Sequence, residues 1–94
     1  MDMVEARAIL RRRLAEAEAA GYERLSFLAA AREVEAYEVE GATGTAYQLE
    51  VLYLWDARPG GAVRVMGSID DGGLSAFAPF TKSVLVAPPA RSGE

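Results

Sequence analysis

The fold is decided by residues 47–55, which read Tyr47-Gln48-Leu49-Glu50-Val51-Leu52-Tyr53-Leu54-Trp55. Large apolar side chains stand at every odd position of this stretch, which is the two-residue period of a β-strand with one buried face. Residues 62–69 follow the same period, with Val63, Val65 and Ile69 in phase. The two segments predict neighbouring strands whose odd-numbered side chains form the floor of a hydrophobic core.

Short glycine-bearing breaks punctuate the chain after residue 33, and each is too short for a crossover connection. These breaks are residues 41–44, 56–61 and 70–73. Hairpins should therefore join the strands in chain order as an antiparallel meander. The predicted strands are residues 34–40, 45–55, 62–69 and 74–80. Residues 84–86, Val-Leu-Val, are either a last short strand or a contact of the tail.

Burial sets the expected register, because a slip of one residue turns every side chain of a strand to the other face. Pairing Glu40 with Thr45, and Ile69 with Leu74, places the most apolar side chains together. The outer strands then add to the core face the residues Val34, Ala36, Leu74, Ala76, Ala78 and Phe80.

Two helical segments precede the strands. Residues 2–20 are rich in alanine, leucine, arginine and glutamate, which favour helices, and their apolar residues recur at three- and four-residue spacing. Asp2 is suited to cap the start of this helix and Gly21 to end it. Residues 22–32 predict a second, shorter helix.

Length and composition agree with one domain. The chain has 94 residues, of which 51% are hydrophobic, so it is too short for two domains and too apolar for intrinsic disorder. The sequence therefore predicts an α+β fold, with one or two N-terminal helices packed on a four-stranded antiparallel meander. This domain is expected over residues 1–87, followed by a flexible tail over residues 88–94.

The other face of the predicted sheet carries unusually many apolar side chains. Leu52 and Leu54 stand there, Met66 lies directly across from Phe77 in the expected register, and Tyr37 lies at the rim. A sheet covered by helices on one side should be polar on the other, and an exposed apolar patch of this kind is typical of an interaction site. We therefore expect these five residues to bind a protein partner or a second copy of the chain, as a homodimer. The alternative is that the second helix or the tail folds over this face.

The turn Asp70-Asp71-Gly72-Gly73 suggests a second function. Two carboxylates on a glycine-rich turn suit a hard cation such as calcium or magnesium. Glu40 is expected nearby, because it precedes the turn of residues 41–44, which lies at the same end of the predicted sheet. The alternative is therefore a cation- or small-ligand-binding protein that uses Glu40, Asp70 and Asp71. Against it, the pattern of a dedicated calcium loop is missing, and aspartate and glycine are ordinary turn residues.

Missing residue types exclude several chemistries. The chain has no cysteine and no histidine, so it offers no thiol nucleophile, no imidazole base and no thiolate or imidazole metal ligand. No catalytic residue and no cofactor are predicted, and the expectation leans away from an enzyme. The net charge of −4 disfavours nucleic acid and anionic membranes, because phosphate groups call for a basic surface. Without a long apolar run or a signal-like start, a cytoplasmic location is expected.

The second half of the chain carries a distinctive motif. It runs from Tyr47 through Trp55-Asp56 to Arg64-Val65-Met66-Gly67-Ser68-Ile69-Asp70-Asp71-Gly72-Gly73 and Ala76-Phe77-Ala78-Pro79-Phe80-Thr81. This motif resembles a family of small uncharacterised bacterial proteins. The likeness covers about a third of the chain. The family has no assigned activity, so the resemblance implies a small helix-plus-sheet protein and transfers no site residue.

Overall fold

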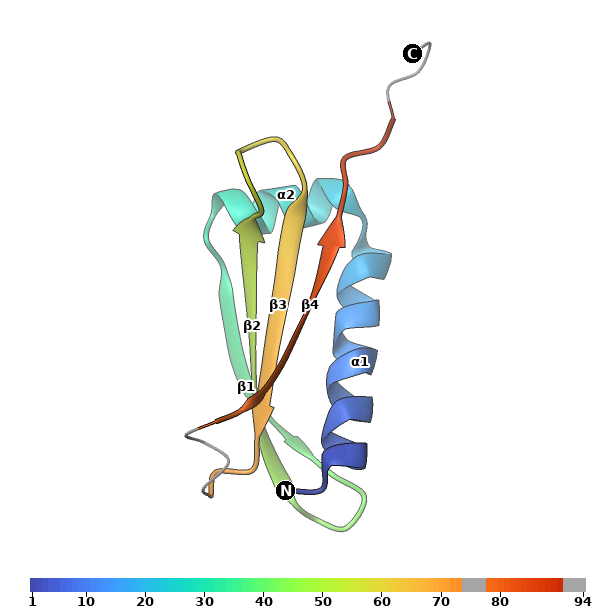
Figure 1. Cartoon of the computed structure of the whole chain (residues 1–94), viewed down its shortest axis with the longest axis vertical. Coiled ribbons are helices and arrows are strands. Elements are labelled where there is room, and N and C mark those ends of the chain that lie inside the picture. Colours follow the sequence, from blue (N-terminus) through green and yellow to red (C-terminus); the bar gives the residue numbers. More distant parts are fainter. Residues whose placement is uncertain (74–77, 91–94) are drawn as a thin grey trace.

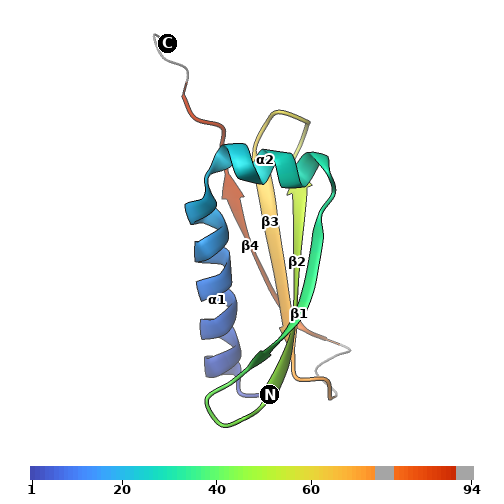
Figure 2. The same ribbon diagram turned by 180° about the vertical axis from the view of Figure 1, so that it is seen from behind.

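The computed structural model describes residues 1–73 and 78–90. Within these residues the chain forms two helices followed by four strands, which pair antiparallel with their neighbours in the order β1-β2-β3-β4. The elements are α1 (Met3–Ala20), α2 (Tyr22–Ala30), β1 (Val34–Glu40), β2 (Ala46–Trp55), β3 (Val63–Asp70) and β4 (Phe80–Val86). The predicted α+β fold with an antiparallel meander is confirmed. Both helices pack on the same face of the sheet. Figure 2 shows α2 in front of the strands and α1 beside them, next to β4, and Figure 1 shows the strands from the other side, with α2 behind them.

The helix boundaries follow the predicted signals. The Asp2 carboxylate accepts a hydrogen bond from the N–H of Glu5 at 3.1 Å and caps the start of α1. Gly21 adopts φ +90°, a conformation that glycine tolerates best, and this separates α1 from α2. The chain turns there, so that α1 runs along the sheet and α2 crosses the strands near one end (Figure 1).

The core lies between the helices and the odd-numbered face of the sheet. Trp55 pairs with Val63 and Leu49 with Ile69, so the predicted core floor is confirmed. The buried residues are Ala6, Leu10, Leu14, Ala17, Leu25, Ala29, Tyr47, Leu49, Val51, Tyr53, Val63, Val65 and Ile69. Each large apolar side chain in this set contributes roughly 1.5–3 kcal/mol by leaving water. Gly67 lets α1 approach closely, because a Cβ atom there would lie 2.6 Å from Leu10 Cδ1.

The β1–β2 hairpin differs from the predicted register by one residue. Glu40 pairs with Ala46 and not with Thr45. The N–H of Gly41 donates to the carbonyl oxygen of Thr45 at 2.7 Å, which takes Thr45 into the turn, and Gly44 reverses the chain at φ +85°. The turn therefore holds one residue more than the sequence suggested.

This shift inverts the two faces of β1. Val34 and Ala36, which were predicted in the core, lie on the outer face, opposite Leu52 and Glu50. Tyr37, predicted at the rim of the outer face, lies instead on the helix side. The prediction failed because β1 has apolar residues at both even and odd positions, so that burial alone does not select its register.

The predicted strand over residues 74–80 is wrong at its described end, where Ala78 and Pro79 precede β4 and do not belong to it. Ile69 pairs with Phe80 and not with Leu74, so β4 begins where the predicted strand ends. Pro79 supplies the reason: proline has no N–H to donate to a ladder, so a strand starts more readily after it than across it. The predicted hairpin that pairs Ile69 with Leu74 across residues 70–73 is therefore wrong.

The structure places the residues predicted after residue 73 in different parts of the fold. Phe80 packs against the core, as predicted. Residues 84–86 belong to β4, which decides between the two alternatives left open for them. Ala78 is exposed and precedes β4, so it is not a core residue. Leu74, Ala76 and Phe77 lie outside the described residues, so their predicted places are not described.

Candidate functional site

An apolar patch occupies the outer face at the end of the sheet where β4 ends. Two cross-strand rows form it: Val34, Leu52 and Met66 in one, and Leu54 and Leu85 on either side of Arg64 in the next. We call Val34, Leu52, Leu54, Met66 and Leu85 the outer patch. Val34 is 52% exposed, Leu85 50% and Leu54 40%, while Leu52 and Met66 are half-buried.

Three of the predicted interaction residues, Leu52, Leu54 and Met66, belong to this patch. The partner of Met66 on β4 is Ser83, so the predicted pairing of Met66 with Phe77 is wrong. Val34 and Leu85 were not predicted. The alternation of Phe80, Val84 and Val86 along one face of β4, with Leu85 on the other, is the sequence signal that could have identified Leu85.

Arg64 sits between Leu54 and Leu85, and its charge is neutralised within the chain. Its Nε and Nη2 atoms donate to Asp56 Oδ1 at 3.0 and 2.8 Å, and its Nη1 donates to Ser83 Oγ at 2.8 Å. A guanidinium that already donates three hydrogen bonds can be covered at lower cost than a free one, because fewer of its donors lose water without a partner. Arginine is also frequent at the centre of protein interfaces.

Among residues 1–73 and 78–90, no helix or loop covers the outer patch. Both α1 and α2 lie against the opposite face, and residues 87–90 lead away from the sheet beyond the end of β4 (Figure 1). The second helix therefore does not shield this face, and neither does the described part of the tail.

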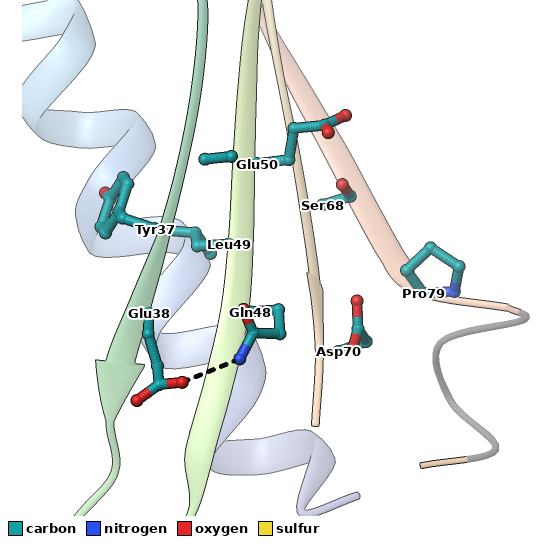
Figure 3. A pocket seen from close by; sticks show the side chains of 9 residues that line it. Tyr37, Glu38, Gln48, Leu49, Glu50, Ser68, Asp70 and Pro79 are labelled. Carbon is teal, nitrogen blue, oxygen red and sulfur yellow. Dashed lines mark hydrogen bonds between the residues drawn. The ribbon is translucent and has the colours of Figure 1, made fainter. Parts of the chain in front are cut away.

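The other half of the outer face is polar and acidic. It holds a hollow of about 400 Å³ whose lining includes Glu38, Gln48, Glu50 and Asp70. Figure 3 shows the Nε2 atom of Gln48 donating to Glu38 Oε2, at 3.1 Å. The outer face is thus divided along the strands into an apolar half and an acidic half.

Of the residues predicted to bind a cation, Asp70 and Asp71 make separate contacts. Asp70 accepts a hydrogen bond from the N–H of Gly72 at 2.8 Å. Asp71 accepts one from the N–H of Gly73, and its Oδ2 lies 3.6 Å from the amino terminus. Glu40 stands at the end of β1. Within the described part of the chain, no three carboxylates gather closely enough to hold a metal ion.

A second hollow, of about 500 Å³, lies on the helix side between both helices and β1. Arg13 Nη2 donates to Glu35 Oε1 at 2.6 Å and to the Tyr53 hydroxyl at 2.9 Å, and that hydroxyl donates to Glu35 at 2.5 Å. Tyr37 lines the same hollow. Sequence reasoning missed this cluster, because the expected register put Val34 and Ala36 in the core and so turned Glu35 to the other face. Burial, followed by the hydrogen bond to Glu35, raises the pKa of Tyr53 to about 12.

Glu5 joins the other end of α1 to the sheet. Its carboxylate accepts from the Tyr47 hydroxyl at 2.7 Å and from the N–H of Ala42 at 2.8 Å. The hydrogen bond to Glu5, together with burial, raises the pKa of Tyr47 to about 12. The contact explains why a tyrosine is accommodated in the core: its ring is buried and its hydroxyl is satisfied.

Comparison with protein families, with curated proteins and with solved structures finds no match for this chain. The resemblance of its second half to small bacterial proteins therefore stays a prediction. Neither helix in the described residues is long and apolar enough to cross a membrane. The case for a function rests on the geometry of the chain itself.

Proposed function

We propose that this chain is a non-enzymatic interaction module that forms a homodimer through the outer patch. The observation that carries the proposal is a sheet with apolar side chains on both faces and helices on only one. Burial of apolar surface would drive association at about 25 cal/mol per Å², offset by the entropy lost when two molecules become one.

Charge favours one orientation of the two copies. A two-fold axis that lies between the two sheets, parallel to them and perpendicular to the strands, brings the apolar halves together and carries the acidic halves to opposite sides. A parallel arrangement would instead place Glu38, Glu50 and Asp70 of one copy against the same residues of the other. Since like charges in contact are unfavourable, the sheets should overlap only at their apolar ends.

The size of the patch sets the expected affinity. An apolar patch of a few hundred Å² lies at the small end of specific interfaces, which bury about 800 Å² on each partner. We therefore expect a transient dimer with a dissociation constant on the order of 1–100 μM.

Leu54→Glu tests the proposal. Each dimer contains two copies of the changed residue, so the dissociation constant should rise by roughly 100-fold or more. The measurement is sedimentation equilibrium over a range of protein concentrations, with thermal unfolding followed by circular dichroism.

Val4→Glu is the matched control, because Val4 is 82% exposed in the first turn of α1, away from the patch. It should leave the dissociation constant unchanged. A monomer at all concentrations up to about 1 mM, or equal weakening by both substitutions, would contradict the proposal. Loss of the folded state in Leu54→Glu would show that the residue serves the core.

A further inference from the structure

An aromatic groove crosses the exposed side of α2 and reaches Trp55 at the end of β2, next to the outer patch. It has a volume of about 630 Å³, and its lining includes Tyr22, Phe27, Ala30, Trp55 and Gly60. We call it the α2 groove. Phe27 is 63% exposed there, although a phenylalanine on a packed helix normally faces the core. Three aromatic side chains therefore face one hollow.

The walls of the α2 groove are held in place by contacts within the chain. The Tyr22 hydroxyl lies 2.9 and 2.7 Å from the carbonyl oxygens of Gly60 and Gly61, which ties the loop after β2 to α2. The Arg24 guanidinium lies over the Phe27 ring, 5.6 Å from its centroid. A groove formed in advance loses little conformational entropy when it is filled.

Aromatic grooves of this kind suit an extended, proline-containing segment. Such a segment is already stiff, so it loses little entropy on binding, and its pyrrolidine rings pack on aromatic faces. The chain itself carries one, Ala87-Pro88-Pro89-Ala90. Each proline fixes its own φ, and the residue before a proline is restricted to extended conformations.

The position of this segment favours a second copy as the acceptor. Residues 87–90 are exposed and leave the sheet at the end where α2 lies, pointing away from the body of their own molecule (Figure 1). Reaching the groove of the same chain would require a reversal that consecutive prolines disfavour. We propose that residues 87–90 of one copy bind in the α2 groove of another. The contact uses no residue of the outer patch, so it stands or falls independently of the proposed dimer.

Trp55 is the only tryptophan of the chain and lies in the groove, so its fluorescence reports occupancy. All variants are made on the full chain with Leu54→Glu, which removes the contribution of the outer patch. We expect the emission maximum to shift to shorter wavelength as protein concentration rises, as burial of Trp55 requires. Pro88→Gly with Pro89→Gly, or Phe27→Ser alone, should abolish the shift. Phe27 is exposed, so the thermal unfolding of each variant should match that of its parent.

Mixing the two variants distinguishes binding of the tail to the groove of another copy from binding of the tail to the groove of its own chain. The proline variant keeps an intact groove, and the Phe27→Ser variant keeps an intact tail. If the tail binds in trans, the mixture regains a concentration-dependent shift that neither variant shows alone. A shift that is independent of concentration and abolished by the proline variant would place the tail in its own groove and overturn the proposal. Identical emission from all variants at every concentration would overturn it as well.

Discussion

At the scale of single residues, two tyrosines each combine a buried ring with a hydroxyl that donates a hydrogen bond to a carboxylate. Tyr47 is bound to Glu5 and Tyr53 to Glu35, so each hydroxyl joins a strand to another part of the fold. Neither tyrosinate is compatible with this arrangement, because a negative oxygen would face a carboxylate. Both pKa values are accordingly raised to about 12.

These raised pKa values predict a loss of stability at high pH. An unfolded tyrosine releases its proton near pH 10, whereas the folded residues keep theirs to about pH 12. Over this interval the folded state binds more protons than the unfolded state, so the free energy of unfolding falls as pH rises; below pH 10 the contribution is fully present. Urea unfolding at pH 9, 10 and 11 should show this fall, and Tyr47→Phe with Tyr53→Phe should reduce its slope. Parallel pH profiles for the two proteins would contradict the prediction.

At the scale of elements, α2 ends in a motif that normally carries glycine. The N–H of Arg32 donates to Ala29 and that of Glu33 to Leu28, at 3.1 and 3.0 Å, which is the hydrogen-bond pattern of a Schellman C-cap. Arg32 occupies its left-handed position at φ +53°. A side chain with a Cβ atom is strained there, so the start of β1 depends on an unfavourable backbone conformation.

Replacing this residue should stabilise the protein. Arg32→Gly is expected to raise the free energy of unfolding by about 0.5–1 kcal/mol, because relief of left-handed strain exceeds the extra entropy of glycine in the unfolded chain. Arg12→Gly, at an exposed position inside α1, is the matched control and should lower that free energy by about 1 kcal/mol. Urea denaturation measures both. A loss of stability in both variants would show that the Arg32 side chain makes a contribution greater than its strain.

At the scale of the whole molecule, the division of the outer face governs how two copies meet. Each copy carries a net charge of −4, and its acidic half-face lies close to the outer patch. Repulsion between copies therefore opposes the proposed dimer, and salt screens it over about 10 Å at 0.1 M.

Salt should therefore strengthen self-association. We expect the dissociation constant measured by sedimentation to fall severalfold between about 0.05 and 0.5 M sodium chloride. Glu50→Gln, next to the patch, should reduce this dependence. Weakening by salt would indicate instead that the contact is held by opposite charges.

The sequence by itself determined the parts whose pattern permits one solution. Strict alternation from Tyr47 to Trp55 specified the core floor, and Asp2 and Gly21 specified the limits of α1. Leu52 and Leu54 followed from the same alternation, because a strand with apolar residues at odd positions must present its even positions outward.

Only the tertiary structure decided how the outer strands pair. Residues 34–40 carry apolar side chains at both even and odd positions. The length of the turn between β1 and β2 therefore selected which side chains face the helices, and it placed Tyr37 on the helix side and Val34 on the outer face. Ile69 pairs with Phe80 and not with Leu74, and this register placed Leu85 in the outer patch. The physical reason is that a face is fixed locally by side-chain period, whereas a register is fixed by contacts between segments that are distant in the sequence.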